Sequence, residues 1–214
     1  MTTLTRRDLM IGGLGLLGAA ALTACTPRTP PAVPVPSSTS TAAADASGFL
    51  SRHDLTGMDA VDIVDHLDQM PVAERPTDLL ASVRADHLLL ADAEQELAIP
   101  LPQDRFYLSL APYLDQTHEC FHHSLTTCQG ELADEQIAVR ILDEVTGEAL
   151  ADGQRTTFDN GFVGFWLPPG ISGTMDITYD RFSSQGAFST HDEAATCLTT
   201  IQLTDSRSAG DSLT

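Results

Sequence analysis

The chain has 214 residues, of which 11 are basic and 30 acidic, and its formal net charge at pH 7 is −19. This charge argues against a protein that binds nucleic acid and against one that docks electrostatically on anionic lipid. Both kinds of protein need basic surface patches. All eleven basic residues are arginine. The absence of lysine excludes enzymes that work through a lysine Schiff base or a lysine general base.

The first 24 residues have the pattern of an export signal. Arg6 and Arg7 precede an apolar run, which ends at Cys25. The paired arginines resemble a twin-arginine signal, and residues 22–25 resemble the lipobox at which a bacterial lipoprotein is cleaved and lipidated. The run is short for a transmembrane helix, which needs about 20 apolar residues. We therefore predict a signal peptide over residues 1–24 and a lipid anchor on Cys25.

Residues 25–48 form the next segment, and they are rich in Pro, Ser, Thr and Ala. This composition favours an extended chain that has no apolar face to bury, so we predict a tether that holds the folded part off the membrane. A compact domain is expected over residues 49–204, a size typical of one domain or two small ones. We place a sub-boundary near residues 115–136 and a disordered tail at residues 205–214.

Within the compact domain, helical periodicity comes first and strand periodicity follows. Apolar side chains recur every third position over residues 56–70, beside aspartates, which predicts an amphipathic helix that ends before Pro71. After it the period shifts to two, and Gly and Pro separate short runs. Strands are expected at 79–83, 88–90, 97–101, 106–110, 137–142, 162–167, 175–179 and 197–203. We predict a mainly β (α+β) fold, an antiparallel sandwich or barrel with the helix on one side.

Residues 115–129 follow neither period, which predicts a long functional loop between two β parts. Within eleven residues the loop holds two cysteines and three histidines: His118, Cys120, His122, His123 and Cys128. Thiolate and imidazole select Cu(I) or Zn(II) over hard cations. The spacing of the two cysteines fits neither a zinc knuckle nor a CxxC redox centre. A further ligand must come from elsewhere, and Cys197, at the start of the last predicted strand, is the candidate.

Three interpretations of the cysteines remain open at this point. Lipidation of Cys25 leaves three cysteines in the mature chain, and an odd number cannot all pair within one chain. The first interpretation is a metal site that uses Cys120, Cys128 and Cys197. The second is a structural disulfide between Cys128 and Cys197, with Cys120 left over. The third is a thiol-dependent redox enzyme with Cys120 as nucleophile, which the lack of a CxxC motif disfavours, so we expect no enzyme.

Several motifs carry a resemblance to a known family. They are YLSLAPY at 107–113, THEC at 117–120, HSLTTC at 123–128, GEL at 130–132, NGFVGFWLP at 160–168 and TCLTT at 196–200. Together they resemble the CueP family of bacterial cell-envelope copper-binding proteins, over about residues 56–203. The resemblance implies copper binding and copper resistance outside the cytoplasm, with Cys120, Cys128 and Cys197 as the residues that matter. It also implies a homodimer.

The resemblance extends to the histidines of the loop. It implies that His118 and His123 join the cysteines as metal ligands, and His122 is an additional candidate. Cu(I) accepts three thiolates, or two thiolates and an imidazole, because a soft closed-shell ion tolerates low coordination numbers. Zn(II) is the alternative metal, and it would take a fourth ligand from a histidine.

The sequence thus predicts a lipid-anchored Cu(I)-binding protein of the cell envelope, which sequesters copper or hands it to a receiving protein. Oxidation of a cysteine pair would stop metal binding, so a thiol reductant protein is an expected partner.

Overall fold

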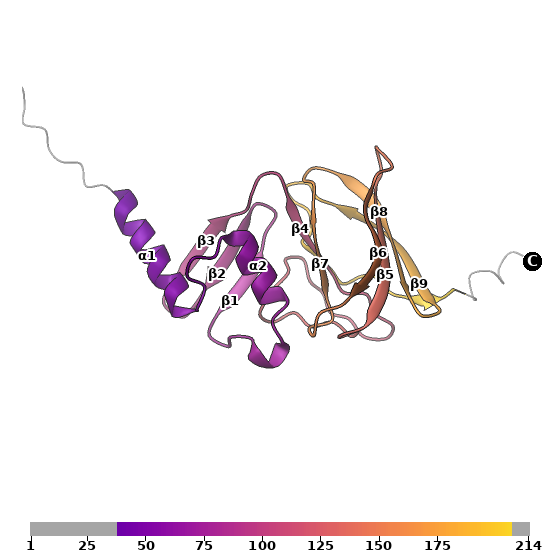
Figure 1. Cartoon of the computed structure of the whole chain (residues 1–214), viewed down its shortest axis with the longest axis horizontal. Coiled ribbons are helices and arrows are strands. Elements are labelled where there is room, and N and C mark those ends of the chain that lie inside the picture. Colours follow the sequence, from indigo (N-terminus) through magenta and orange to yellow (C-terminus); the bar gives the residue numbers. More distant parts are fainter. Residues whose placement is uncertain (1–37, 207–214) are drawn as a thin grey trace, which may run out of the picture. The chain divides into compact units, whose positions relative to one another are not determined.

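The structure is a computed structural model that describes residues 38–206. The predicted signal peptide with Arg6 and Arg7, the predicted anchor at Cys25, and the predicted tail from residue 207 onward lie outside the described residues. Within the described part, no helix is both long and apolar enough to cross a bilayer. Two α-helices lead into a series of strands (Figure 1). The predicted mainly β fold is confirmed.

Helix α1 (Ser38–Arg52) begins inside the segment predicted to be an extended tether. The structure differs from that prediction over residues 38–48. The reason is local, because the last proline of the segment is Pro36 and the alanine-rich run after it has a high helix propensity. At the end of α1, Phe49 is fully buried, and the Arg52 guanidinium lies 5.5 Å from the centre of its ring. The last turn therefore anchors α1 on the core.

Helix α2 (Ala60–Asp68) is the predicted amphipathic helix, shorter at both ends than the periodicity suggested. It begins after Asp59, whose side chain accepts hydrogen bonds from the backbone N–H groups of Val61 and Asp62 and so caps the first turn. Its buried face contains apolar residues and also Asp68, the last residue of the helix. A short 3-10 helix, Val72–Glu74, follows Pro71.

The strands form three sheets. The first is antiparallel with the order β1-β2-β3, made of Leu80–Val83, His87–Ala91 and Glu96–Pro100. The second has the order β10-β4-β7, made of Cys197–Leu198, Phe106–Leu110 and Val163–Leu167. The third has the order β11-β9-β8-β5-β6, made of Thr204–Asp205, Phe182–Ser189, Ser172–Tyr179, Gln136–Asp143 and Ala149–Thr156. Strand β10 runs parallel to β4, and their register places Cys197 opposite Ser109.

Strand β4 is buried on both faces. Phe106, Leu108 and Leu110 pack into a core shared with β5, β7 and β8, which joins the second and third sheets as a sandwich. Tyr107 and Ser109 point the other way, because successive side chains of a strand alternate between faces. Tyr107 belongs to the second core, which contains the end of α1, helix α2 and the first sheet. The face of β4 that carries Tyr107 and Ser109 therefore lies under α2.

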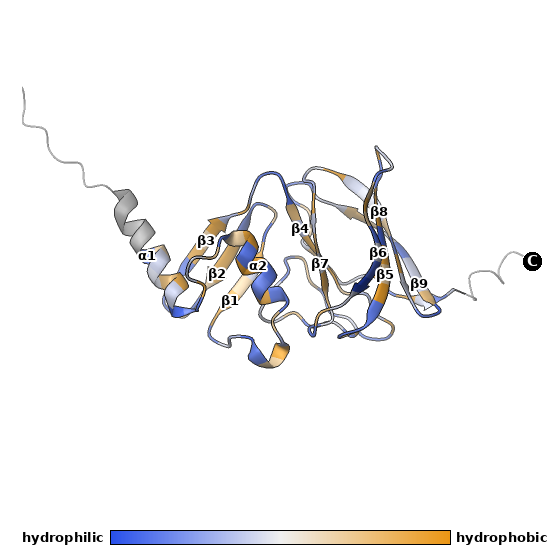
Figure 2. Cartoon of the chain, in the orientation of Figure 1, coloured by the Kyte–Doolittle hydropathy of each residue, from blue (hydrophilic) through white to orange (hydrophobic). Residues whose placement is uncertain are grey.

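Among the longer strands, the sequence analysis missed β6 and β9, each of eight residues. Strand β6 is mostly exposed and is drawn largely in the hydrophilic colour (Figure 2). Strand β9 has only one buried residue, Phe188. Neither strand shows the alternation of apolar and polar residues that predicted the others, because each buries little of its surface. Their pairing with β5 and β8 defines them instead.

The last predicted strand, residues 197–203, is interrupted. The chain pairs with β4 only over Cys197–Leu198 and then crosses to β9 as β11. Between the two strands, the Thr199 carbonyl accepts a hydrogen bond from the Thr117 hydroxyl at 2.5 Å. In a continuous strand a backbone N–H would donate to this carbonyl, and here the side chain of the loop residue Thr117 donates instead. Strand β11 also means that the predicted disordered tail starts with an ordered residue, Asp205.

Candidate metal centre

The Cys/His loop lies between β4 and β5, as predicted, and backbone hydrogen bonds fix it at both sides. The N–H of Val83 donates to the carbonyl of His123 at 2.8 Å, and that of Leu125 donates to the carbonyl of Ala81 at 2.9 Å. On the other side, the N–H of Thr196 donates to the carbonyl of Phe121 at 2.9 Å. The loop is therefore held between β1 and the residues that lead into β10.

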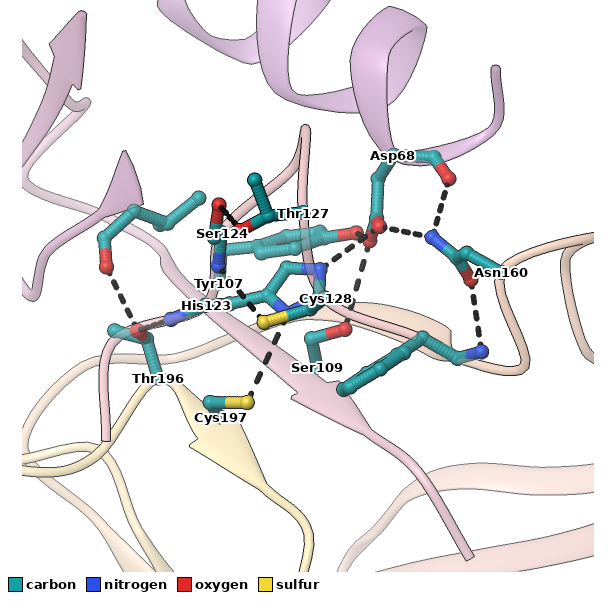
Figure 3. Close-up of polar contacts among 12 residues, drawn as sticks. Asp68, Tyr107, Ser109, His123, Ser124, Thr127, Cys128, Asn160, Thr196 and Cys197 are labelled. Carbon is teal, nitrogen blue, oxygen red and sulfur yellow. Dashed lines mark hydrogen bonds and ion pairs between the residues drawn. The ribbon is translucent and has the colours of Figure 1, made fainter. Parts of the chain in front are cut away.

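Five of the predicted ligands come together as two overlapping groups. His118, Cys120 and Cys128 form the first group, and His123, Cys128 and Cys197 form the second. In each group the candidate ligand atoms all lie within 4.8 Å of one another. Cys128 belongs to both groups, and its Sγ lies 3.5 Å from the Sγ of Cys120. Figure 3 shows the sulfur atoms of Cys128 and Cys197 near the His123 ring. All three cysteines are free thiols.

The two groups differ in burial. His118 is exposed and Cys120 is half-buried. Cys128 has an exposed fraction of 8%, Cys197 of 1% and His123 of 0%. The buried end of the centre is lined by apolar side chains, above all the fully buried ring of Phe162, whose centre lies 4.6 Å from that of the His123 ring. Water is therefore excluded from the second group but can reach the first.

Asp68 holds the His123 ring, and the sequence analysis missed it. The Nε2 of His123 lies 2.8 Å from Oδ1 of Asp68, and its Nδ1 lies 3.8 Å from the Sγ of Cys197 (Figure 3). Asp68 also accepts hydrogen bonds from the Tyr107 hydroxyl at 2.5 Å and the Asn160 amide at 2.9 Å. A carboxylate on the far nitrogen fixes the tautomer and direction of a metal-binding imidazole. Asp68 therefore aims Nδ1 at the thiols.

Hydrogen bonds and neighbouring charges shift the pKa values of His123, Cys128 and Cys120. Burial alone would lower the pKa of His123, but the charge of Asp68 and the hydrogen bond to it raise that pKa to about 9. The pKa of Cys128 lies far below its ordinary value, because the Cys120 and Cys197 thiols donate hydrogen bonds to its sulfur and His123 is adjacent. The hydrogen bond to Cys128 raises the pKa of Cys120 to about 12. These contacts favour the thiolate form at Cys128, the form that binds metal.

The chain is similar to known proteins in sequence and in structure. The model of a family described as "Periplasmic copper-binding protein CueP" matches residues 62–202. The chain belongs to the CueP family of periplasmic copper-binding proteins. The crystal structure of S.CueP is 39% identical in sequence with a TM-score of 0.70, and the match covers 74% of this chain and 97% of that one. No curated protein matches the chain. The predicted family is confirmed, and the matched range contains both groups of ligands.

Arg75 places a positive charge beside the centre of this CueP-family chain. Its Nη1 donates to the carbonyl of Cys128 at 2.8 Å, and its Nη2 lies 4.0 Å from Oδ1 of Asp68. Its side chain is buried, and Nε and Nη2 have no hydrogen-bond partner among the described residues. A buried cation is stable only beside compensating anions. Arg75 therefore balances the carboxylate of Asp68 and the thiolate of Cys128.

His122, the additional candidate, lies outside both groups of ligands. Its ring packs edge-on against Phe121, with ring centres 4.7 Å apart. Burial, together with the positive charge of Arg84, lowers the pKa of His122. The adjacent His123 points into the centre instead, where Asp68 holds its ring.

A close contact of two glycines closes the loop against the start of β7. The N–H of Gly130 donates to the carbonyl of Asn160 at 2.7 Å. A Cβ on Gly161 would lie 2.5 Å from the backbone oxygen of Gly130, and Gly161 has a φ of +78°. Both the contact and the backbone angle therefore require glycine at this position.

We expect Gly161→Ala to destabilise the chain by about 2–4 kcal/mol, the sum of backbone strain and steric conflict at a site that cannot relax. Gly170→Ala is the matched control, because Gly170 has a similar φ of +72° but no atom within 4 Å of a Cβ. Urea unfolding of the reduced, metal-free protein measures both changes. Equal losses in the two variants would show that the contact between Gly130 and Gly161 contributes nothing.

Proposed function

We propose that the chain binds Cu(I) in the cell envelope and thereby sequesters copper or hands it on, without catalysing a reaction. The observation that supports this most is the second group of ligands. It combines two sulfurs with an imidazole nitrogen that a carboxylate holds in position, in a buried apolar surrounding. Cu(I) prefers soft ligands and accepts three of them. The copper binding of the family agrees with this assignment.

The number of ligands favours copper over zinc. Each group offers three ligand atoms, whereas structural zinc is almost always bound by four protein ligands in a tetrahedron. A fourth ligand for the buried group would have to come from Cys120 or His118, and both belong to the exposed group. Cu(I) therefore fits the centre with no rearrangement, and zinc would need one.

Thiol oxidation would control binding in our proposal. The Sγ atoms of Cys120 and Cys128 are 3.5 Å apart. Loss of two electrons to an oxidant of the envelope, together with the thiol proton of Cys120, would join the two sulfurs in a disulfide and remove the ligand shared by both groups. A thiol reductant protein would return the two electrons and restore the site. We also propose that a second protein receives the copper, and that the chain forms a homodimer.

The lipid anchor completes the proposal. A lipid on Cys25 would keep the copper centre at the outer face of the membrane. The periplasmic location of the family supports export of the chain. The protein would then act as a fixed store, which supports copper resistance by lowering the free Cu(I) near the membrane.

Anaerobic titration of the reduced chain with Cu(I), in competition with a chromophoric chelator, tests this function. We expect one Cu(I) to bind per chain and Zn(II) in excess not to displace it, because zinc lacks a fourth ligand in the buried group. The same titration after oxidation of the thiols should show binding lost. Binding of Zn(II) that prevents the uptake of Cu(I) would contradict the assignment of copper.

A further inference from the structure

We propose that the centre holds copper in two alternating positions. Copper arrives at an outer position, made by His118, Cys120 and Cys128, and moves to an inner position, made by His123, Cys128 and Cys197. The inference rests on the proposed function and says how the ion reaches its buried ligands. Cys128 is the ligand that the two positions share, because it belongs to both sets of ligand atoms. Within each set, all the ligand atoms lie within 4.8 Å of one another.

Burial distinguishes the two positions. His118 is exposed, and it lines a surface hollow of about 330 Å³ together with Thr117 and Cys120. It also lines a second hollow beside Gly130. The inner ligands Cys197 and His123 have exposed fractions of 1% and 0%. A copper donor can therefore touch the outer ligands from solvent, but it cannot touch the inner ones.

The inner ligands are held by secondary structure and by partners. Cys197 is the first residue of β10, and it pairs with Ser109 of β4. His123 is held at Nε2 by Asp68 at 2.8 Å. His118 and Cys120 lie on the loop outside the strands, and the Cys120 sulfur contacts the His122 carbonyl at 3.4 Å and the Cys128 sulfur at 3.5 Å. Preorganised ligands bind more tightly because they lose less conformational entropy. Copper should therefore rest at the inner position.

The transfer between the positions is a ligand exchange that needs no electron. Copper stays Cu(I) and keeps its bond to the Cys128 sulfur throughout. The bonds to His118 and Cys120 break as those to His123 and Cys197 form. The proton that leaves the Cys197 sulfur is taken up by the Cys120 sulfur, and the Nδ1 proton of His123 passes to the released imidazole of His118. At the inner position two thiolates and one Cu(I) carry a net negative charge. Arg75 lies close enough to offset it, and its buried Nε and Nη2 have no hydrogen-bond partner in the described part of the chain.

Variants of the two positions should change different quantities. The full reduced chain is mixed with the Cu(I) complex of a bathocuproine-type chelator, and transfer is followed by absorbance in a stopped-flow instrument. We expect Cys120→Ser and His118→Ala to slow the uptake and the release of copper by the same factor, about tenfold. Substitutions within one binding interface commonly change association rates by this much. We expect His123→Gln to weaken equilibrium affinity by about 10–100-fold while initial uptake stays fast. The glutamine side-chain amide keeps an N–H donor for the carboxylate of Asp68. If the His123→Gln protein fails to fold, Cys197→Ser tests the same inner position.

His87→Ala is the control, because the ring of His87 lies outside the centre and is hydrogen-bonded to Asp86. The proposal is overturned if Cys120→Ser weakens equilibrium affinity as much as Cys197→Ser does, since that result means a single site of three cysteines. It is also overturned if Cys120→Ser changes neither the rates nor the affinity. Failure of the unsubstituted chain to take Cu(I) from the chelator is a different result, and it would contradict the proposed function itself.

Discussion

Cys128→Ser is expected to abolish tight Cu(I) binding, with a loss of affinity of more than a hundredfold. Replacing a residue that only supports a ligand typically costs about 10–100-fold in metal affinity, and Cys128 is itself the candidate ligand shared by both groups. A serine hydroxyl is a hard, neutral donor that does not replace a thiolate for Cu(I). The remaining thiols, Cys120 and Cys197, belong to different groups, so neither group keeps more than one sulfur.

Competition with the chelator measures this loss under reducing, anaerobic conditions. Thr127→Ser is the matched control, because Thr127 is exposed, precedes Cys128 in the loop and lies in neither group. It should leave affinity unchanged. If the Cys128→Ser protein keeps the affinity of the unsubstituted chain, the centre described here does not bind the copper.

Asp68→Ala is expected to have the largest effect on stability, about 3–5 kcal/mol, the usual cost of leaving a buried charge without its partner. The substitution leaves His123 and Arg75 without their common anion, and the Tyr107 hydroxyl without its acceptor. In a domain of this size such a loss lowers Tm by about 10 °C. Asp68→Asn should cost less, because the amide oxygen still accepts hydrogen bonds.

Denaturant unfolding of the reduced, metal-free protein provides the measurement. Asp62→Ala is the control on the same helix, because Asp62 is exposed, and a surface substitution of this kind changes stability by less than about 0.5 kcal/mol. The account also predicts weaker copper binding in the Asp68→Asn protein, because its His123 ring is held less firmly. If Asp68→Ala and Asp62→Ala unfold at the same denaturant concentration, Asp68 does not hold the centre together.

Local patterns were sufficient to predict much of the fold and of the centre. Strand β4 lies where alternation predicted it, with the same bounds, Phe106–Leu110. The loop of cysteines and histidines was predicted because it breaks both periods. Cys197 could be included because its position at a strand start and the odd number of cysteines both pointed to it. These inferences need only neighbours in sequence and simple counting.

Asp68 was not predicted, because its role depends on contacts made far along the chain. In the sequence it is one of several aspartates in an acidic helix. A signal was nevertheless present, since Asp68 comes four residues after the buried Val64 and so falls on the apolar face of α2. A carboxylate on that face must have buried partners. Those partners, Tyr107 and Asn160, come from strands and turns that no local pattern connects to the helix.

X-ray absorption at the copper edge, on the reduced chain loaded with one equivalent of Cu(I), identifies the atoms that bind the copper. The account predicts an edge typical of Cu(I) and a three-coordinate first shell of two sulfurs and one nitrogen, the set offered by His123, Cys128 and Cys197. A first shell of oxygen and nitrogen without sulfur would contradict it, because copper would then lie away from the thiols.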